Sequence, residues 1–214
     1  MLVLLIIATV ISAFAFAIAA IKLWKKGKPL YFQILTCAIG CYALFELAVL
    51  VMTYCDINQT YFNTSVFGLI ACDLFLFCAN RGDIEKVFEK PKRKFFILSI
   101  VAGALFFVAS VIAAIFYFKT SSVAFYLFIL IQIPTSFVVY FNVRHLLSSS
   151  KDQSLKRRIN LLDIGSLVFC VLFLVDFACW INVSTLTGIM DLVTSLVVLA
   201  LSILTIKGAE KWNI

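Results

Sequence analysis

Seven apolar runs, each about 20 residues long, divide this 214-residue chain and restrict what it can fold into. A run of that length is what an α-helix needs to cross the hydrocarbon core of a bilayer. The chain is 64% hydrophobic and 14% charged, whereas soluble domains are about half apolar and about a quarter charged. We therefore expect an all-α fold: a polytopic membrane protein with seven transmembrane helices in one domain, residues 1–214. The helices are expected at residues 2–21, 30–53, 62–80, 95–118, 123–143, 159–182 and 184–206.

The basic residues occupy alternate loops. Of the 18 Lys and Arg, 17 follow the first, third and fifth runs or lie in the tail, and only Lys119 lies on the opposite side. The positive-inside rule then predicts an N-terminus outside and a C-terminus in the cytoplasm. Because the net charge of +7 comes from these short loops, it indicates topology, and no nucleic acid partner is expected.

Four acidic residues lie well inside apolar runs and are the main candidates for function: Glu46, Asp73, Asp176 and Asp191; a fifth, Asp163, lies near the inner end of the sixth run. A charged group at bilayer depth costs about 3 kcal/mol or more, so intramembrane acids usually have a function. No Lys or Arg lies within the runs, so each acid must be protonated, hydrogen-bonded or paired with a bound cation. Helix rise places Asp73 about 16 Å below the outer surface. We expect the four acids to line a cavity that opens outward, with Asp73 at its floor.

Further polar residues extend these faces. Asn80 lies two turns after Asp73, and Gln132 and Tyr140 share one face of the fifth run with Ser136. Asn80, Gln132 and Tyr140 are added to the acids as candidate ligand- or ion-binding residues. Pro134 lies inside the fifth run, where a proline frees a carbonyl and usually kinks the helix, so we expect a hinge there. No catalytic residue and no cofactor is assigned, and the pattern does not say whether a metal binds.

The runs also fit a three-plus-one-plus-three repeat, in which runs one to three and five to seven share an orientation. Glu46 then corresponds to Asp176, and Asp73 to Asp191. Parallel repeats of this kind occur in known transporters.

The seven-helix plan resembles that of the small sugar transporters of the PQ-loop type, of rhodopsins and of seven-helix receptors. The residues differ from each family's pattern. The transporters carry prolines in several helices, whereas only Pro134 is internal here, and no lysine lies inside a run as a rhodopsin requires. Asn80-Arg81-Gly82 stands where animal receptors have Asp-Arg-Tyr. The segment Cys72-Asp73-Leu74 resembles the Gly-Asp segment of the lysoplasmalogenase membrane family over a few residues only, so no family is assigned.

Three residue-level expectations concern the loops and the surface. The charged loop Arg81–Lys94 is expected to be a solvated turn that starts as a helical extension, and His145 is expected at the surface of the cytoplasmic edge. Cys55 and Cys179 both fall near the outer surface, so a disulfide between them is one alternative and free thiols are the other.

Three functions fit these features. The favoured one is a secondary transporter or channel for a cation or small cationic solute, with proton coupling through Asp73. The second is a receptor or accessory membrane subunit that signals through the basic loops. The third, less favoured, is an intramembrane enzyme with a carboxyl pair as acid and base. Expected partners are the lipid bilayer, the cation or solute, and a second copy or another membrane protein. The Lys- and Ile-rich, loop-poor composition favours a bacterial cytoplasmic membrane.

Overall fold

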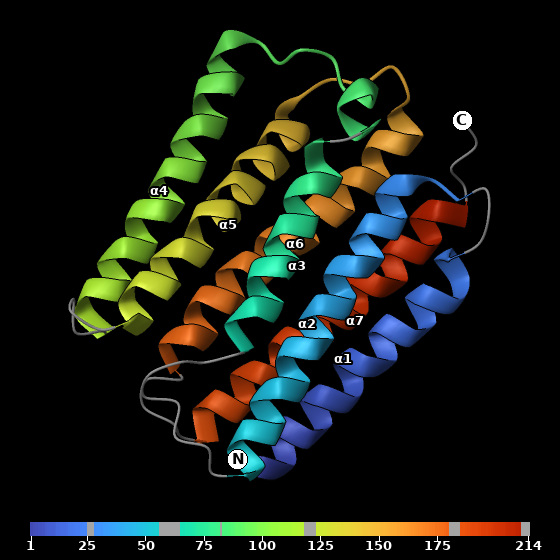
Figure 1. Cartoon of the computed structure of the whole chain (residues 1–214). Helices are drawn as coiled ribbons and strands as arrows, with labels where there is room; N and C mark the ends of the chain where they lie inside the picture. The colour runs from blue at the N-terminus through green and yellow to red at the C-terminus, as the bar shows by residue number, and fades with distance from the viewer. Residues whose placement is uncertain (25–27, 56–64, 82, 118–122, 180–184, 211–214) are drawn as a thin grey trace.

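Helices make up the regular structure of the chain (Figure 1). The computed structural model describes residues 1–24, 28–55, 65–81, 83–117, 123–179 and 185–210. Within these ranges it has seven α-helices and one short 3-10 helix, and no strand, so the all-α prediction is confirmed. The elements are α1 (Leu2–Leu23), α2 (Leu30–Tyr54), α3 (Ser65–Arg81), η1 (Asp83–Val87), α4 (Arg93–Tyr117), α5 (Val123–Leu147), α6 (Gln153–Cys179) and α7 (Thr185–Glu210).

Six of the helices are long and apolar enough to cross a membrane: α1, α2, α4, α5, α6 and α7. Helices of this kind indicate an integral, multi-pass membrane protein. The described part of α3 has 17 residues, and residues 62–64 of the predicted third span lie outside the described ranges. The seventh span and the orientation in the membrane therefore stay predictions.

Three helices continue further into the predicted loops than hydropathy indicates. Helix α5 ends at Leu147 and α7 at Glu210, and α6 begins at Gln153 rather than at residue 159. The start of α6 is capped by Asp152, whose carboxylate Oδ1 accepts a hydrogen bond from the backbone N–H of Leu155 at 2.9 Å. A helix can extend beyond the bilayer because its backbone hydrogen bonds are internal. Hydropathy thus marks the expected bilayer crossing and not the helix ends.

Six helices form a closed ring in which each packs on the next, in the order α1, α2, α3, α5, α6, α7 and back to α1. Helix α4 lies at the edge of the bundle, where α5 is its main neighbour (Figure 1). Helices α1–α3 and α5–α7 thus follow each other around the ring with α4 outside it. This order is compatible with a three-plus-one-plus-three plan, although the repeat itself stays a prediction.

Small residues close the ring between α1 and α7. Ala8, Ala15 and Ala19 are fully buried on one face of α1, whereas Ala13 and Ala17 are exposed. A Cβ added to Gly188 of α7 would lie 3.1 Å from the Cβ of Leu4, so the two backbones approach closely there. The Ser202 hydroxyl donates a hydrogen bond of 2.7 Å to the Ala15 carbonyl. Close packing and hydroxyl bonds of this type hold helices together in lipid, where apolar burial alone supplies little attraction.

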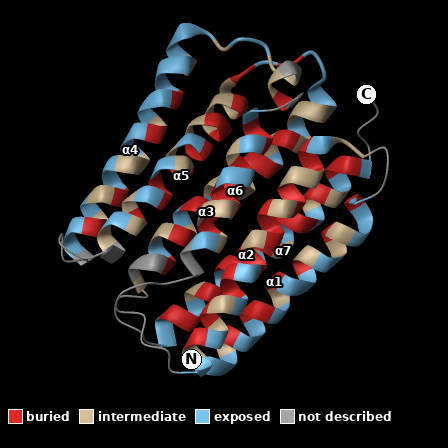
Figure 2. Ribbon diagram, viewed as in Figure 1, coloured by how far each residue is buried: buried red, intermediate tan, exposed pale blue. Residues whose placement is uncertain are grey.

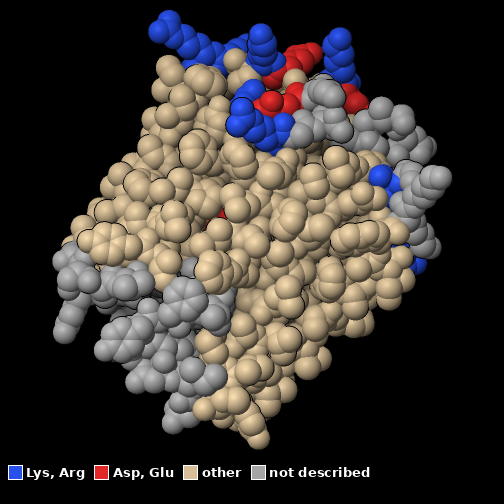
Figure 3. Space-filling model, viewed as in Figure 1, with Lys and Arg blue, Asp and Glu red and all other residues tan. Residues whose placement is uncertain are grey.

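The outer surface of the bundle is apolar, and the charged residues gather mainly at one end (Figure 3). Buried residues line the inside of the bundle, and exposed ones face outward along α4 (Figure 2). We call the charged end the basic end; it contains the ends of α3 and α5, η1 and the starts of α4 and α6, with Arg81, Arg93, Arg144 and Arg157. An apolar belt with charges beyond it is the surface that a bilayer requires.

Labelling with a membrane-impermeant thiol reagent tests whether α3 crosses the bilayer. In a variant whose other cysteines are alanine, Cys55 at the end of α2 is compared with a cysteine placed at Glu89, and both positions are exposed. If α3 spans, the two thiols react from opposite sides of sealed vesicles. Reaction of both from the same side would show that α3 does not cross.

The attachment of α4 depends on Gly103, where an added Cβ would lie 2.9 Å from the Ser136 carbonyl oxygen of α5. Because that neighbour is backbone, Gly103→Leu should push α4 away from α5 and lower the unfolding free energy by about 1–3 kcal/mol. Thermal unfolding in detergent micelles measures the loss. Ala109→Leu, at an exposed position of α4 that does not line the α4–α5 groove, is the matched control. An equal effect of both substitutions would contradict this account of the α4–α5 contact.

Candidate functional site

Three of the four intramembrane acids meet inside the ring. Glu46 of α2, Asp176 of α6 and Asp191 of α7 are 0%, 1% and 0% exposed. The carboxyls of Asp176 and Asp191 are within hydrogen-bonding reach of each other, and Glu46 is close enough to interact electrostatically with both. We call these three residues the acid cluster. It brings together helices that are far apart in the sequence.

Hydroxyl groups hold the acid cluster in place. The Tyr42 hydroxyl donates a hydrogen bond of 2.6 Å to Glu46 Oε1 from one helical turn earlier on α2. Tyr42 also hydrogen-bonds Ser195, which lies one turn after Asp191 on α7. Ser195 in turn lies 3.0 Å, oxygen to oxygen, from the Ser12 hydroxyl of α1. A continuous set of polar contacts therefore joins α1, α2 and α7 around the carboxyls.

The acid cluster contains no basic side chain from the membrane segments, because α2 and α7 have no Lys or Arg up to residue 206 and α6 has none after Arg158. Glu46 Oε2 and Asp176 Oδ1 are buried and have no hydrogen-bond partner among the described residues. Ionised carboxylates only accept hydrogen bonds, so a bond between Asp176 and Asp191 requires a proton on one of them. The acid cluster therefore needs either a proton or a bound cation to neutralise its carboxyl groups.

Asp73 is buried in a different part of the bundle. Its Oδ2 lies 2.5 Å from the Thr135 hydroxyl of α5, and that hydroxyl also lies 2.9 Å from the Ile131 carbonyl oxygen. Within the described ranges, Asp73 interacts with Thr135 and with the thiols of Cys72 and Cys170, and not with the acid cluster. The expectation that all four acids share one cavity is thus met by three of them only.

The other candidates connect α5 to its neighbours. The Asn80 amide donates to Asn142 Oδ1 at 2.8 Å, which joins α3 to α5. Gln132 Oε1 accepts a hydrogen bond of 3.2 Å from Ser110, which joins α5 to α4. Pro134 lies inside a continuous α5, so the hinge stays a prediction. None of these residues belongs to the acid cluster.

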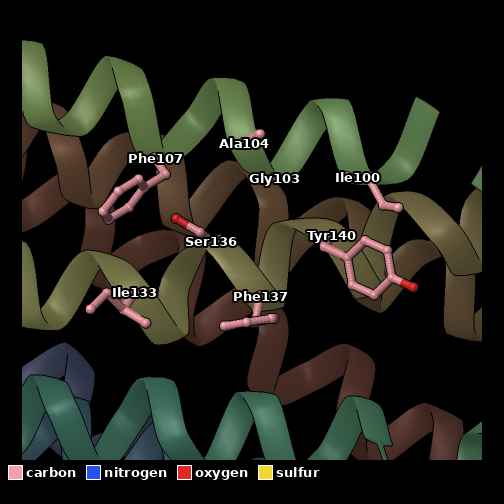
Figure 4. A pocket seen from close by; sticks show the side chains of 8 residues that line it. All are labelled: Ile100, Gly103, Ala104, Phe107, Ile133, Ser136, Phe137 and Tyr140. Carbon is pink, nitrogen blue, oxygen red and sulfur yellow. The ribbon is translucent and has the colours of Figure 1, made fainter. Parts of the chain in front are cut away.

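Tyr140 borders a groove between α4 and α5 (Figure 4). The groove has a volume of about 570 Å³ and a nearly entirely apolar lining. It is lined by Ile100, Gly103, Ala104, Phe107, Ile133, Ser136, Phe137 and Tyr140. A second groove, of about 400 Å³, runs along α1 and α2 and includes Thr9 and Phe75. None of the four acids lines either groove, so the outward-opening cavity that we expected remains a prediction.

Two of the expectations for the basic end are wrong. His145 is only 2% exposed, because the ring of Phe88 stacks on it with centroids 4.7 Å apart. The loop Arg81–Lys94 is not a solvated turn throughout, since it forms η1 and Ile84 within it is fully buried. Cys55 and Cys179 are free cysteines in the structure, so the disulfide alternative is not realised.

Sequence reasoning missed two residues of the site, Tyr42 and Ser12, whereas Ser195 accompanies Asp191 on the polar face of the seventh run. Tyr42 could have been found, because it precedes Glu46 by one helical turn and both face the same side. Ser12 carried no comparable signal, since many hydroxyls occur in these helices. Among the described residues, no three His, Cys, Asp or Glu side chains are arranged to hold a metal ion.

Comparison of the chain with family models, curated proteins and solved structures found no match, so the site must be interpreted from its own geometry.

Removing the Tyr42 hydroxyl should destabilise the protein, because Glu46 Oε1 would lose its buried donor. We expect Tyr42→Phe to lower the unfolding free energy by about 1–3 kcal/mol, measured by thermal unfolding in detergent. Tyr126→Phe is the control, since Tyr126 is 63% exposed on α5. If Tyr42→Phe unfolds like the wild type, the hydroxyl does not support the acid cluster.

Proposed function

We propose that the protein is a small secondary transporter that exchanges a cation at the acid cluster and couples this exchange to protons. The observation that carries the proposal is the meeting of Glu46, Asp176 and Asp191 in a buried position, with no Lys or Arg in the membrane segments that supply them. Intramembrane acids that face a bundle interior typically belong to ion or proton pathways.

The chemistry of the cluster favours a proton as one of the exchanged ions. The Asp176–Asp191 contact requires a proton, and the unpartnered Glu46 Oε2 and Asp176 Oδ1 offer oxygen ligands to an incoming cation. Two ionised carboxylates this close repel each other, so the cluster needs a positive charge to neutralise them. A cation that enters the cluster can supply this charge in place of the proton. Competition between proton and cation for the same oxygens is the simplest form of coupling.

The surrounding helices could allow such a site to change access. The cluster joins α2, α6 and α7, which come from opposite halves of the chain. Transporters with repeats place their binding sites between the halves and alternate access by moving one half against the other. The contacts across this boundary include the Ser12–Ser195 and Ser202–Ala15 hydrogen bonds between α1 and α7, which a movement of one half against the other would have to break.

Flux measurements in proteoliposomes test the proposal. Purified protein is reconstituted with a pH-sensitive dye inside, and a gradient of sodium or potassium ions across the vesicle membrane drives proton movement in the opposite direction. Asp176→Asn and Asp191→Asn should abolish the flux while the variants still fold, because an amide cannot exchange a proton. Glu210→Gln, on the same helix as Asp191 but exposed, should transport like the wild type. Unchanged flux in both cluster variants would overturn the proposal.

A carboxyl pair within hydrogen-bonding reach also supports a second candidate, an intramembrane enzyme with Asp176 and Asp191 as acid and base. Such an enzyme needs a route for its substrate, and neither groove is lined by these acids. The flux assay separates the two candidates, since an enzyme of this kind requires no proton movement across the bilayer.

A further inference from the structure

A second set of buried polar groups lies at the basic end, between α5 and α6. His145, the one histidine of the chain, is 2% exposed, and Asp163 is 1% exposed. His145 Nδ1 lies 3.5 Å from Asp163 Oδ1. The proposed transport at the acid cluster does not involve this pair. Burying two titratable groups in a membrane protein costs free energy, and such groups usually have a function.

Apart from the Nδ1–Oδ1 contact of the pair itself, several polar atoms around it are buried and unpartnered among the described residues: Asn142 Nδ2, His145 Nε2, Asn160 Oδ1 and Asp163 Oδ2. Asn142 lies one turn before His145 on α5, and Asn160 one turn before Asp163 on α6. Each unsatisfied buried group destabilises the folded protein, because it has given up its hydrogen bonds to water. Such a group in a native structure calls for a polar partner. Because the set contains both donors and acceptors, water fits it better than an anion or a bare cation.

The segment after α3 covers this site from the end of the bundle. The rings of Phe88 and His145 are nearly parallel, at 5°. The backbones of Phe88 and Ser150 form an isolated antiparallel β-bridge. The Ser150 hydroxyl also donates a hydrogen bond of 2.8 Å to the Val87 carbonyl oxygen. Arg144 and Glu85 form an ion pair at 3.1 Å across the same junction. The site therefore lies one layer below the charged surface.

The same helix carries this pair and part of the acid cluster. Asp163 and Asp176 lie on the buried face of α6, about 20 Å apart at a helical rise of about 1.5 Å per residue. Between them Phe169 and Phe173 are buried and stacked, and Tyr42 packs against Phe169 with ring centroids 5.3 Å apart. Aromatic rings thus separate a polar site at the basic end from the acid cluster.

We propose that His145 and Asp163, with water bound among Asn142, Asn160 and the pair, form a proton-exchange site that serves the basic end of the pathway. This role rests on the proposed transport function, whereas the water-binding site does not. The titratable and charged groups on neighbouring elements are Tyr31 of α2, which interacts electrostatically with Asp163, and the Arg144–Glu85 pair. His145 can pass a proton between water and Asp163 because imidazole both donates and accepts.

The single histidine makes the water site directly observable. In protein with isotope-labelled histidine, deuterated elsewhere except for Val methyls, NMR magnetisation transfer from water to the His145 ring should be strong. The methyls of Val138, which is 0% exposed on the same helix, give the dry reference. A His145 ring that receives no more magnetisation than Val138 would overturn the inference.

The flux assay tests the exchange role. Asp163→Asn should abolish proton flux, while Asp152→Asn, exposed at the same end and still able to cap α6, should leave it unchanged. Wild-type flux in Asp163→Asn would overturn the exchange role even if His145 contacts water. If the wild-type protein carries no flux, the transport function and the exchange role both fail, and the NMR result alone decides the water site.

Discussion

The cost of placing carboxyl groups in a low-dielectric interior without a basic partner governs the organisation of this bundle. A charge buried in this way is tolerated only when it is neutralised, hydrogen-bonded or paired. The chain supplies no Lys or Arg in the segments around Glu46, Asp176 and Asp191. Tyrosine and serine hydroxyls supply hydrogen bonds instead, and a shared proton is needed between two of the acids. The polar groups therefore bind the helices together and also create a demand for an exchangeable ion.

The buried polar groups form separate levels along α6. Asp163 lies with His145 near the basic end, Cys170 lies near Asp73, and Asp176 belongs to the acid cluster. The stacked rings of Phe169 and Phe173 lie on the buried face of α6 between Asp163 and Asp176. Asp73, hydrogen-bonded to Thr135, lies at the intermediate level.

Sequence reasoning succeeded where the signal was a property of one helix. Run length and composition predicted the helices, and acids within apolar runs marked the residues that proved to be buried in the core. It failed where the outcome depended on a neighbouring element. His145 looked like a surface residue because basic loops flank it, but Phe88 from a distant loop covers it. Asn80, Gln132 and Tyr140 lie where α5 meets α3 and α4, outside the acid cluster, so their role as ligands stays a prediction.

The sequence alone determined that this chain forms apolar helices suited to a membrane and that four carboxyls lie well inside such helices, away from any Lys or Arg in the same run. Both follow from local physics, since a bilayer of about 30 Å demands apolar helices of about 20 residues. Only the tertiary structure decided which acids meet. The ring order brings α2, α6 and α7 together and leaves Asp73 against α5. Helix packing depends on the side-chain surfaces of two helices at once, so no single stretch of sequence contains that information.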